Sequence, residues 1–354
     1  MMRQVLGRFV LGGAGALVVV LAYMTEPART SHAWLAAWIA AWVTAVGALA
    51  VLCLAWLSNG EWIVPMRRLF EALCSSLPLS SLALAPALVL RFETVVWARA
   101  IVVLALPIVA VEWLAYLSRA QDVEGAPRED GLRHASTFGL LVAFVSTTVA
   151  AFDWIGGLHP RWVSNALGLE LLSGGGVTAL GVIGVIVAVR MLRARAGSIG
   201  VEHLLTLARA LFVGACAWMY LSFAPFLVVW MGDLPAGVSW YGPRVTGAWW
   251  WLATSIVLAR FVVPFVVLLT DPMRRRPIVV LVIAALLALT EPLVLAWLVF
   301  PSSSPARVSL RWSDLGVLVL VVSLVMIVSW ARMRSASHAD GDPLLARTAS
   351  YRAR

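Results

Sequence analysis

Ten long apolar runs, separated by short polar segments, follow one another along the chain. Each run holds roughly the 20 apolar residues that a helix needs to cross a bilayer, and inside lipid only a helix satisfies its own backbone polar groups. The pattern therefore predicts an all-α, polytopic membrane protein of about ten transmembrane helices. The predicted spans are roughly 4–24, 34–58, 72–91, 95–117, 134–152, 166–190, 204–230, 246–269, 278–299 and 313–331. Pro78 and Pro86 interrupt the third run.

Composition supports a membrane protein and argues against both a soluble domain and a nucleic-acid-binding protein. Hydrophobic residues make up 62% of the 354 residues and charged residues 13%, whereas a soluble domain holds about 25% charged residues. The net charge of +9 does not indicate nucleic-acid binding, because the arginines lie at helix ends and in one set of loops. We expect a transmembrane domain over 1–331 and a disordered cytoplasmic tail over 332–354.

The arginines also predict the orientation. Alternate loops are rich in arginine, and these loops are expected in the cytoplasm. The arginines on this side are Arg67, Arg68, Arg119, Arg128, Arg133, Arg190, Arg193, Arg195 and Arg274–Arg276, with those of the tail. Both termini are then cytoplasmic, which requires an even number of spans.

A few charged residues fall inside predicted spans, where charges are costly and often functional. Arg260 and Glu291 are the deepest, about 14 Å and about 20 Å from the cytoplasmic ends of consecutive helices at 1.5 Å per residue. We predict that they form an ion pair. This pair could fix the helix register, or it could belong to a proton relay or a quinone site; Glu112 and Glu170 are further candidates for the relay or quinone site.

The outer loop between the fifth and sixth spans carries an unusual concentration of functional side chains. These are Asp153, Trp154, His159, Arg161 and Trp162. The loop could dock a partner protein or form the rim of a quinone pocket, and we favour docking.

The sequence lacks the ligands of common redox cofactors. The three cysteines are isolated, and the five histidines lie at span edges, in loops or in the tail, whereas a membrane haem usually needs two facing histidines within a bundle. We expect no haem, iron–sulfur cluster or metal ion on this chain. No Walker-type loop is present either, so ATP is not expected to drive it.

Six segments combine aromatic, charged and proline residues in a fixed order. They are Trp62 with Arg67-Arg68 and Glu71; Phe92 to Arg99 with Ser118-Arg119-Ala120-Gln121-Asp122; Phe152-Asp153-Trp154 with Leu158-His159-Pro160-Arg161-Trp162; Ala217 to Tyr220 with Leu227 to Pro235 and Trp240-Tyr241; Arg260 to Phe265; and Glu291 with Trp297 to Pro301. This ordered set resembles the NrfD/PsrC-like membrane subunits, and most closely the ActF-type subunits of alternative complex III.

The resemblance implies two four-helix bundles flanked by one extra helix at each end, in a bacterial inner membrane. It implies partners: multihaem c-type cytochromes, an iron–sulfur protein and a second NrfD-like membrane subunit. It also implies quinol oxidation at the outer side and proton half-channels. At four positions the chain departs from the family pattern: Arg260 replaces a histidine, Glu291 and His159 each replace an aspartate, and Pro225 replaces a glutamine.

Together these observations predict a membrane subunit of a respiratory quinol:cytochrome c, or quinol:acceptor, oxidoreductase, with quinone or quinol as a possible ligand. One alternative is an NrfD/PsrC-like anchor of a molybdopterin or iron–sulfur reductase. A secondary transporter is a further alternative, but the matched broken helices that mark such proteins are not evident.

Overall fold

The computed structural model describes residues 16–17, 19–89, 94–159, 162, 164–302, 311–335, 343–348 and 351–352. Every regular element in these residues is helical, which confirms the all-α class. The longer helices are α2 (Pro27–Leu57), α5 (Thr94–Glu124), α6 (Glu129–Ala150), α7 (Leu167–Leu192), α8 (Val201–Gly232), α10 (Gly247–Val257), α13 (Pro277–Val299) and α14 (Trp312–Ser335). The shorter ones are η1 (Glu61–Met66), α3 (Arg67–Cys74), α4 (Leu77–Val89), η2 (Ala151–Ile155), η3 (Gly156–Leu158), α9 (Pro235–Tyr241), η4 (Gly242–Val245), η5 (Leu258–Val262), α11 (Val263–Val267), α12 (Asp271–Arg274), η6 (Phe300–Ser302) and α15 (Leu345–Thr348).

Within the described residues, eight helices are long and apolar enough to cross a membrane. They correspond to eight of the ten predicted spans, so the chain is a polytopic helical membrane protein. The predicted span 4–24 lies mostly outside the described residues. The predicted span 72–91 is divided between α3 and α4, and the total of ten stays a prediction.

The division between α3 and α4 lies at two serines rather than at the prolines. Ser75 and Ser76 turn their hydroxyls back onto the carbonyl oxygens of Ala72 and Leu73, at 2.6 and 2.8 Å, a contact that competes with the helical hydrogen bonds. Pro78 lies in the first turn of α4, where its missing N–H has no helical partner to lose. The chain therefore breaks the helix before Pro78.

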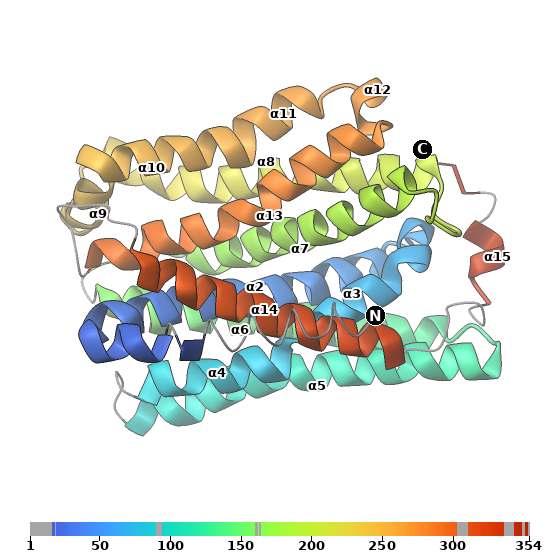
Figure 1. Cartoon of the computed structure of the whole chain (residues 1–354), viewed down its shortest axis with the longest axis horizontal. Helices are drawn as coiled ribbons and strands as arrows, with labels where there is room; N and C mark the ends of the chain where they lie inside the picture. The colour runs from blue at the N-terminus through green and yellow to red at the C-terminus, as the bar shows by residue number, and fades with distance from the viewer. Residues whose placement is uncertain are drawn as a thin grey trace.

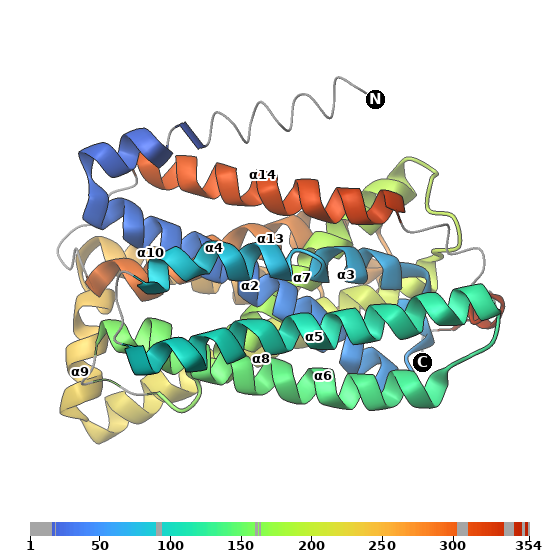
Figure 2. The ribbon, with the colours of Figure 1, turned by 90° about the horizontal axis from the view of Figure 1, so that it is seen from below.

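The helices form two bundles that meet at α2 and α7. In the first bundle, α3, α4 and α6 pack around α2, and α5 packs on α6; in the second, α8 and α13 pack on α7, and α10 and α11 complete it. Gly47 and Gly175 allow α2 and α7 to touch, since a Cβ on Gly175 would lie 1.9 Å from the carbonyl oxygen of Val43. Figure 2 shows α14 along one edge of the molecule, where it packs on α2 and α3, and α5 with α6 along the opposite edge.

The arginine-rich loops gather at one end of the bundle. Figure 1 places α12, the turn between α5 and α6, and α15 at this end, and α9 at the other. We call them the arginine-rich end and the α9 end. That the arginine-rich end faces the cytoplasm stays a prediction.

Part of the predicted disordered tail is folded. Residues Leu345–Thr348 form α15, which packs against η1, and Leu344 and Thr348 are buried. The Tyr351 hydroxyl lies 2.9 Å from the Thr206 hydroxyl of α8. The expectation of disorder therefore needs correction at these residues, which lie against the arginine-rich end.

Candidate functional site

Arg260 lies in a π turn, η5, between α10 and α11. The cause is local: Pro264 has no N–H to donate to the carbonyl of Arg260, and its ring would clash with that carbonyl in a regular α-helix. The chain widens by one residue instead, and the N–H of Val263 donates to the carbonyl of Leu258. Such π turns are rare and frequently mark functional sites.

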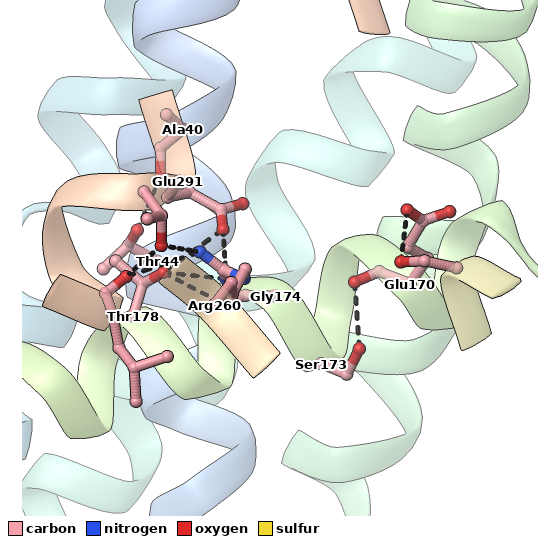
Figure 3. A network of polar contacts seen from close by, with 11 residues as sticks. Ala40, Thr44, Glu170, Ser173, Gly174, Thr178, Arg260 and Glu291 are labelled. Carbon is pink, nitrogen blue, oxygen red and sulfur yellow. Dashed lines mark hydrogen bonds and ion pairs between the residues drawn. The ribbon is translucent and has the colours of Figure 1, made fainter. Parts of the chain in front are cut away.

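The predicted ion pair between Arg260 and Glu291 is confirmed. The Nη2 of Arg260 lies 2.5 Å from Oε2 of Glu291, and the side chains are 0% and 2% exposed. Two threonines complete the polar cluster: Thr178 donates to the same oxygen of Glu291 at 3.2 Å, and Thr290 accepts from Arg260 at 3.0 Å. Figure 3 shows the side chains of Thr178 of α7, Arg260 of η5 and Glu291 of α13 converging.

Backbone carbonyls and an aromatic ring complete the environment of Arg260. Its guanidinium donates to the carbonyl of Gly174 at 2.7 Å and, more weakly, to that of Leu287 at 3.4 Å. It also lies 4.9 Å from the ring centre of Trp218. A buried charge of this kind is tolerable only when it is paired and hydrogen-bonded, and here it is both.

Gly174 leaves the room that the ion pair needs. A Cβ at this position would lie 3.2 Å from Oε2 of Glu291 and 3.4 Å from Nη2 of Arg260, closer than most side-chain contacts. The run Gly174-Gly175-Gly176 is visible in the sequence and indicates a close contact on α7. Which helices make that contact can be seen only in the structure. The threonines carried no sequence signal, and Trp218 appeared in the sequence only as part of the motif segment Ala217 to Tyr220.

Glu170 lies one helical turn from Gly174 on the same face of α7, about 6 Å nearer the α9 end. Ser222 of α8 donates to its Oε1 at 2.7 Å. Figure 3 shows Glu170 pointing away from the Arg260 cluster. The carboxylate faces a cavity of about 400 Å³ between α7, α8, α9, α10 and α13, and Trp218 lines the same cavity. Trp218 thus lies between the cavity and the ion pair.

A second buried arginine lies at the α9 end. Arg244 is 0% exposed and donates to the carbonyls of Trp240 and Leu298 at 2.7 and 2.9 Å. Its guanidinium lies 3.9 Å from the ring centre of Trp240, and Trp162 stacks on the same indole at 3.9 Å. Burial lowers the pKa of Arg244 to about 9, which still leaves the group charged at neutral pH.

His159 adjoins this arginine. Its Nε2 lies 3.5 Å from Nη2 of Arg244. Burial, and then the positive charge of Arg244, lower the pKa of the imidazole from its ordinary value. The ring is therefore neutral at pH 7, in the form that can accept a hydrogen bond from the guanidinium.

The structure separates the five candidates of the outer loop into two groups. Asp153 lies in the π turn η2 and pairs with Arg99 of α5 through two hydrogen bonds of 2.7 Å, while Trp154 is buried against Trp42 of α2. His159 and Trp162 instead join the second bundle, where Trp162 lines the cavity. Arg161 lies outside the described residues. A docking role for the loop stays a prediction.

Glu112 is not brought together with the other carboxylate candidates. Its side chain is 49% exposed on α5, and it pairs with Arg332 at 2.9 Å and Arg119 at 3.5 Å. The pair with Arg332 ties α14 to α5 on the surface of the first bundle. Nothing in this position connects Glu112 to the Arg260 cluster.

Two segments that carried the resemblance meet at the arginine-rich end. Arg67 and Arg68 of α3 both pair with Asp122 of α5, and Ser118 donates to Glu71 at 2.5 Å. The Arg67-Arg68 and Glu71 part of the first motif and the Ser118–Asp122 part of the second therefore form one polar contact within the first bundle.

In the described residues, no group of three or more His, Cys, Asp or Glu side chains is placed to hold a metal ion. The prediction that this chain carries no haem, iron–sulfur cluster or metal stays a prediction. No protein-family model matches the chain, and no curated protein matches its sequence.

Proposed function

We propose that the chain is an integral membrane subunit of a respiratory quinol:cytochrome c, or quinol:acceptor, oxidoreductase, where it supports quinol oxidation and proton movement. The observation that carries this proposal is the buried ion pair between Arg260, in a π turn within one membrane-spanning segment, and Glu291 of α13. The assignment to this type of complex rests on the six ordered motifs of the sequence.

The chemistry of the cluster suits proton handling. A carboxylate inside a membrane is a common element of proton relays, and hydroxyl groups within hydrogen-bond reach can pass a proton on. Glu291 has the Thr178 hydroxyl at 3.2 Å, and Arg260 has the Thr290 hydroxyl at 3.0 Å. The nearby Glu170 provides a second carboxylate on the side of the α9 end.

The proposal places the electron carriers on partners. These are a multihaem c-type cytochrome and an iron–sulfur protein outside the bacterial inner membrane, with a second NrfD-like subunit within it. Quinol would then be oxidised near the α9 end, and the arginine-rich end, with both termini, would face the cytoplasm.

Purification of the native complex through a tag on this chain tests the assignment. We expect haem-containing and iron–sulfur subunits to co-purify, and quinol to reduce the cytochrome. Recovery with a molybdopterin enzyme instead would favour the alternative anchor role, and recovery of the chain alone with solute transport activity would overturn the proposal.

The same complex carrying Glu291→Gln tests the proton role. We expect slower quinol-dependent cytochrome reduction, or loss of the proton movement coupled to it, while Glu112→Gln, the exposed carboxylate on α5, retains both. Normal rates and normal coupling in an assembled Glu291→Gln complex would leave the pair with a structural role alone.

A further inference from the structure

The two bundles differ in charge at the arginine-rich end. On the second bundle, residues 190–209 and 271–276 carry seven arginines and two carboxylates. On the first bundle, residues 61–71 and 112–133 carry five arginines and seven carboxylates, and Arg332 of α14, which pairs with Glu112, does not reverse this balance. The second bundle therefore has a strongly basic surface at this end, and the first does not.

The arginines of the two bundles also differ in their partners. In the first bundle, Glu112, Asp122 and Glu124 pair with four of the five arginines. In the second bundle, Glu202 and Asp271 pair with three of the seven. Among the described residues, no carboxylate pairs with four exposed arginines, which we call the basic surface: Arg190, Arg193, Arg195 and Arg276.

The contacts of α8 bring the two parts of the basic surface to the same side of the bundle. The loop that carries Arg193 and Arg195 leads directly into α8, and α12 packs against α8. Nη1 of Arg275, next to Arg276, lies 2.6 Å from Oε1 of Glu202 in the first turn of α8. The start of α8 therefore lies between the arginines of the loop and those of α12.

The basic surface lies at the height of the lipid headgroups. The 26 residues of α7 span about 39 Å, which is longer than the hydrocarbon core of about 30 Å and close to the full bilayer thickness. Exposed apolar side chains accompany the arginines at this height, namely Leu192, Val201 and Met273. Such a mixture suits the boundary between lipid tails and headgroups, where apolar side chains face the tails and charged groups face the phosphates.

We propose that the basic surface binds the phosphate groups of anionic phospholipids in the leaflet at the arginine-rich end. A guanidinium donates two parallel hydrogen bonds to a phosphate, and clustered arginines next to membrane-spanning helices favour anionic lipids. A zwitterionic headgroup carries its own cation, which the arginines repel. The exposed apolar side chains favour a lipid over an acidic protein as the ligand. The proposal concerns the surface of this chain alone and does not depend on the proposed complex.

Native mass spectrometry of the full-length chain, released from nanodiscs of equal parts phosphatidylglycerol and phosphatidylcholine, tests the proposal. One arginine near a membrane surface is worth about fivefold in affinity. We therefore expect the wild type to retain phosphatidylglycerol over phosphatidylcholine by at least about fivefold. The triple variant Arg190→Gln, Arg193→Gln and Arg195→Gln should retain the two lipids almost equally.

A matched control removes three arginines from the first bundle at the same end. Arg119→Gln, Arg128→Gln and Arg133→Gln should keep the preference of the wild type, because carboxylates outnumber arginines there. All of these side chains lie on the surface, so we expect the melting temperature in phosphatidylcholine to stay within a few degrees of the wild type for both triple variants. No preference in the wild type, an unchanged preference in the first triple variant, or an equal loss in the control would each overturn the proposal.

A photo-crosslinker distinguishes the lipid from a protein ligand. With benzoylphenylalanine in place of Arg195 in native membranes, we expect adducts with phospholipid. A specific adduct with an acidic protein at this position would overturn the proposal in favour of a protein partner.

Discussion

Arg244 and Arg260 are two buried guanidinium groups in the same bundle, and they meet the requirement for a counter-charge in different ways. Both are 0% exposed, both lie over a tryptophan ring, and both donate to backbone carbonyls. Arg260 also pairs with Glu291. Among the described residues, no carboxylate pairs with Arg244.

The position of the carbonyl groups explains how Arg244 manages without a carboxylate. Trp240 and Leu298 lie in the last turns of α9 and α13, where carbonyls lack helical partners and carry the partial negative charge of the helix dipole. Arg244 therefore caps two helix ends at once.

Arg260 lies in the middle of the bundle, and the carbonyls that it contacts are inside helices rather than at their ends. Its carbonyl partners, Gly174 and Leu287, lie within α7 and α13. Carbonyls inside a helix lack the partial negative charge of a helix C-terminus. The guanidinium of Arg260 therefore needs a carboxylate as its counter-charge. The comparison teaches that depth along the bundle decides whether a dipole suffices or a full opposite charge is required.

Removal of the deeper arginine should have the largest effect. Arg260→Ala leaves the carboxylate of Glu291 buried without its partner, and breaking a buried pair in this way costs about 3–5 kcal/mol. We expect a lowered unfolding midpoint in denaturant, measured on the protein in mixed micelles.

A double variant sharpens this result. Arg260→Leu combined with Glu291→Leu removes both charges, and apolar replacement of a buried pair is often neutral or stabilising. We expect stability near that of the wild type, with proton-linked activity lost. Wild-type stability in Arg260→Ala alone would contradict our account of the pair.

The shallower arginine should matter less. Arg244→Gln removes the charge but leaves an amide that can still donate one of the two hydrogen bonds, and a hydrogen bond to a charged group contributes about 1.5–3 kcal/mol. We expect a loss within that range in the same unfolding measurement. A loss as large as that of Arg260→Ala would show that helix ends do not substitute for a carboxylate here.

The sequence could predict one of these two sites but not the other. Counting residues from the ends of two apolar runs placed Arg260 and Glu291 within one helical turn in depth, and consecutive antiparallel helices usually touch, so the pair followed. The sequence did not indicate the site of Arg244, because the partners of its guanidinium are backbone carbonyls, which no residue type identifies.

The same limit applies to the fold and the cavity. Apolar runs locate helices because the bilayer imposes their length, and eight of them stand as spans in the described residues. The cavity, by contrast, is lined by side chains from five α-helices that are separated in the sequence. The π turn at Arg260 could be predicted only in part. Pro264 is visible in the sequence, but its effect on the helix register depends on packing.

The smallest expected effect concerns the proton balance of His159 beside Arg244. Burial, and secondarily the charge of Arg244, hold the pKa of His159 below its ordinary value of 6.5, so the unfolded chain binds this proton more readily than the folded one. The stabilising contribution is fully present above about pH 6.5 and is lost as the pH falls through the lowered pKa. We expect the melting temperature to fall between about pH 7 and pH 5, with a shallower fall in His159→Gln. Arg244→Gln should lie between the two, because it removes the charge and leaves the burial. Identical pH profiles for the wild type and His159→Gln would mean that the imidazole is no harder to protonate in the folded protein than in the unfolded chain. The positive charge of Arg244 would then have no effect on the pKa of His159.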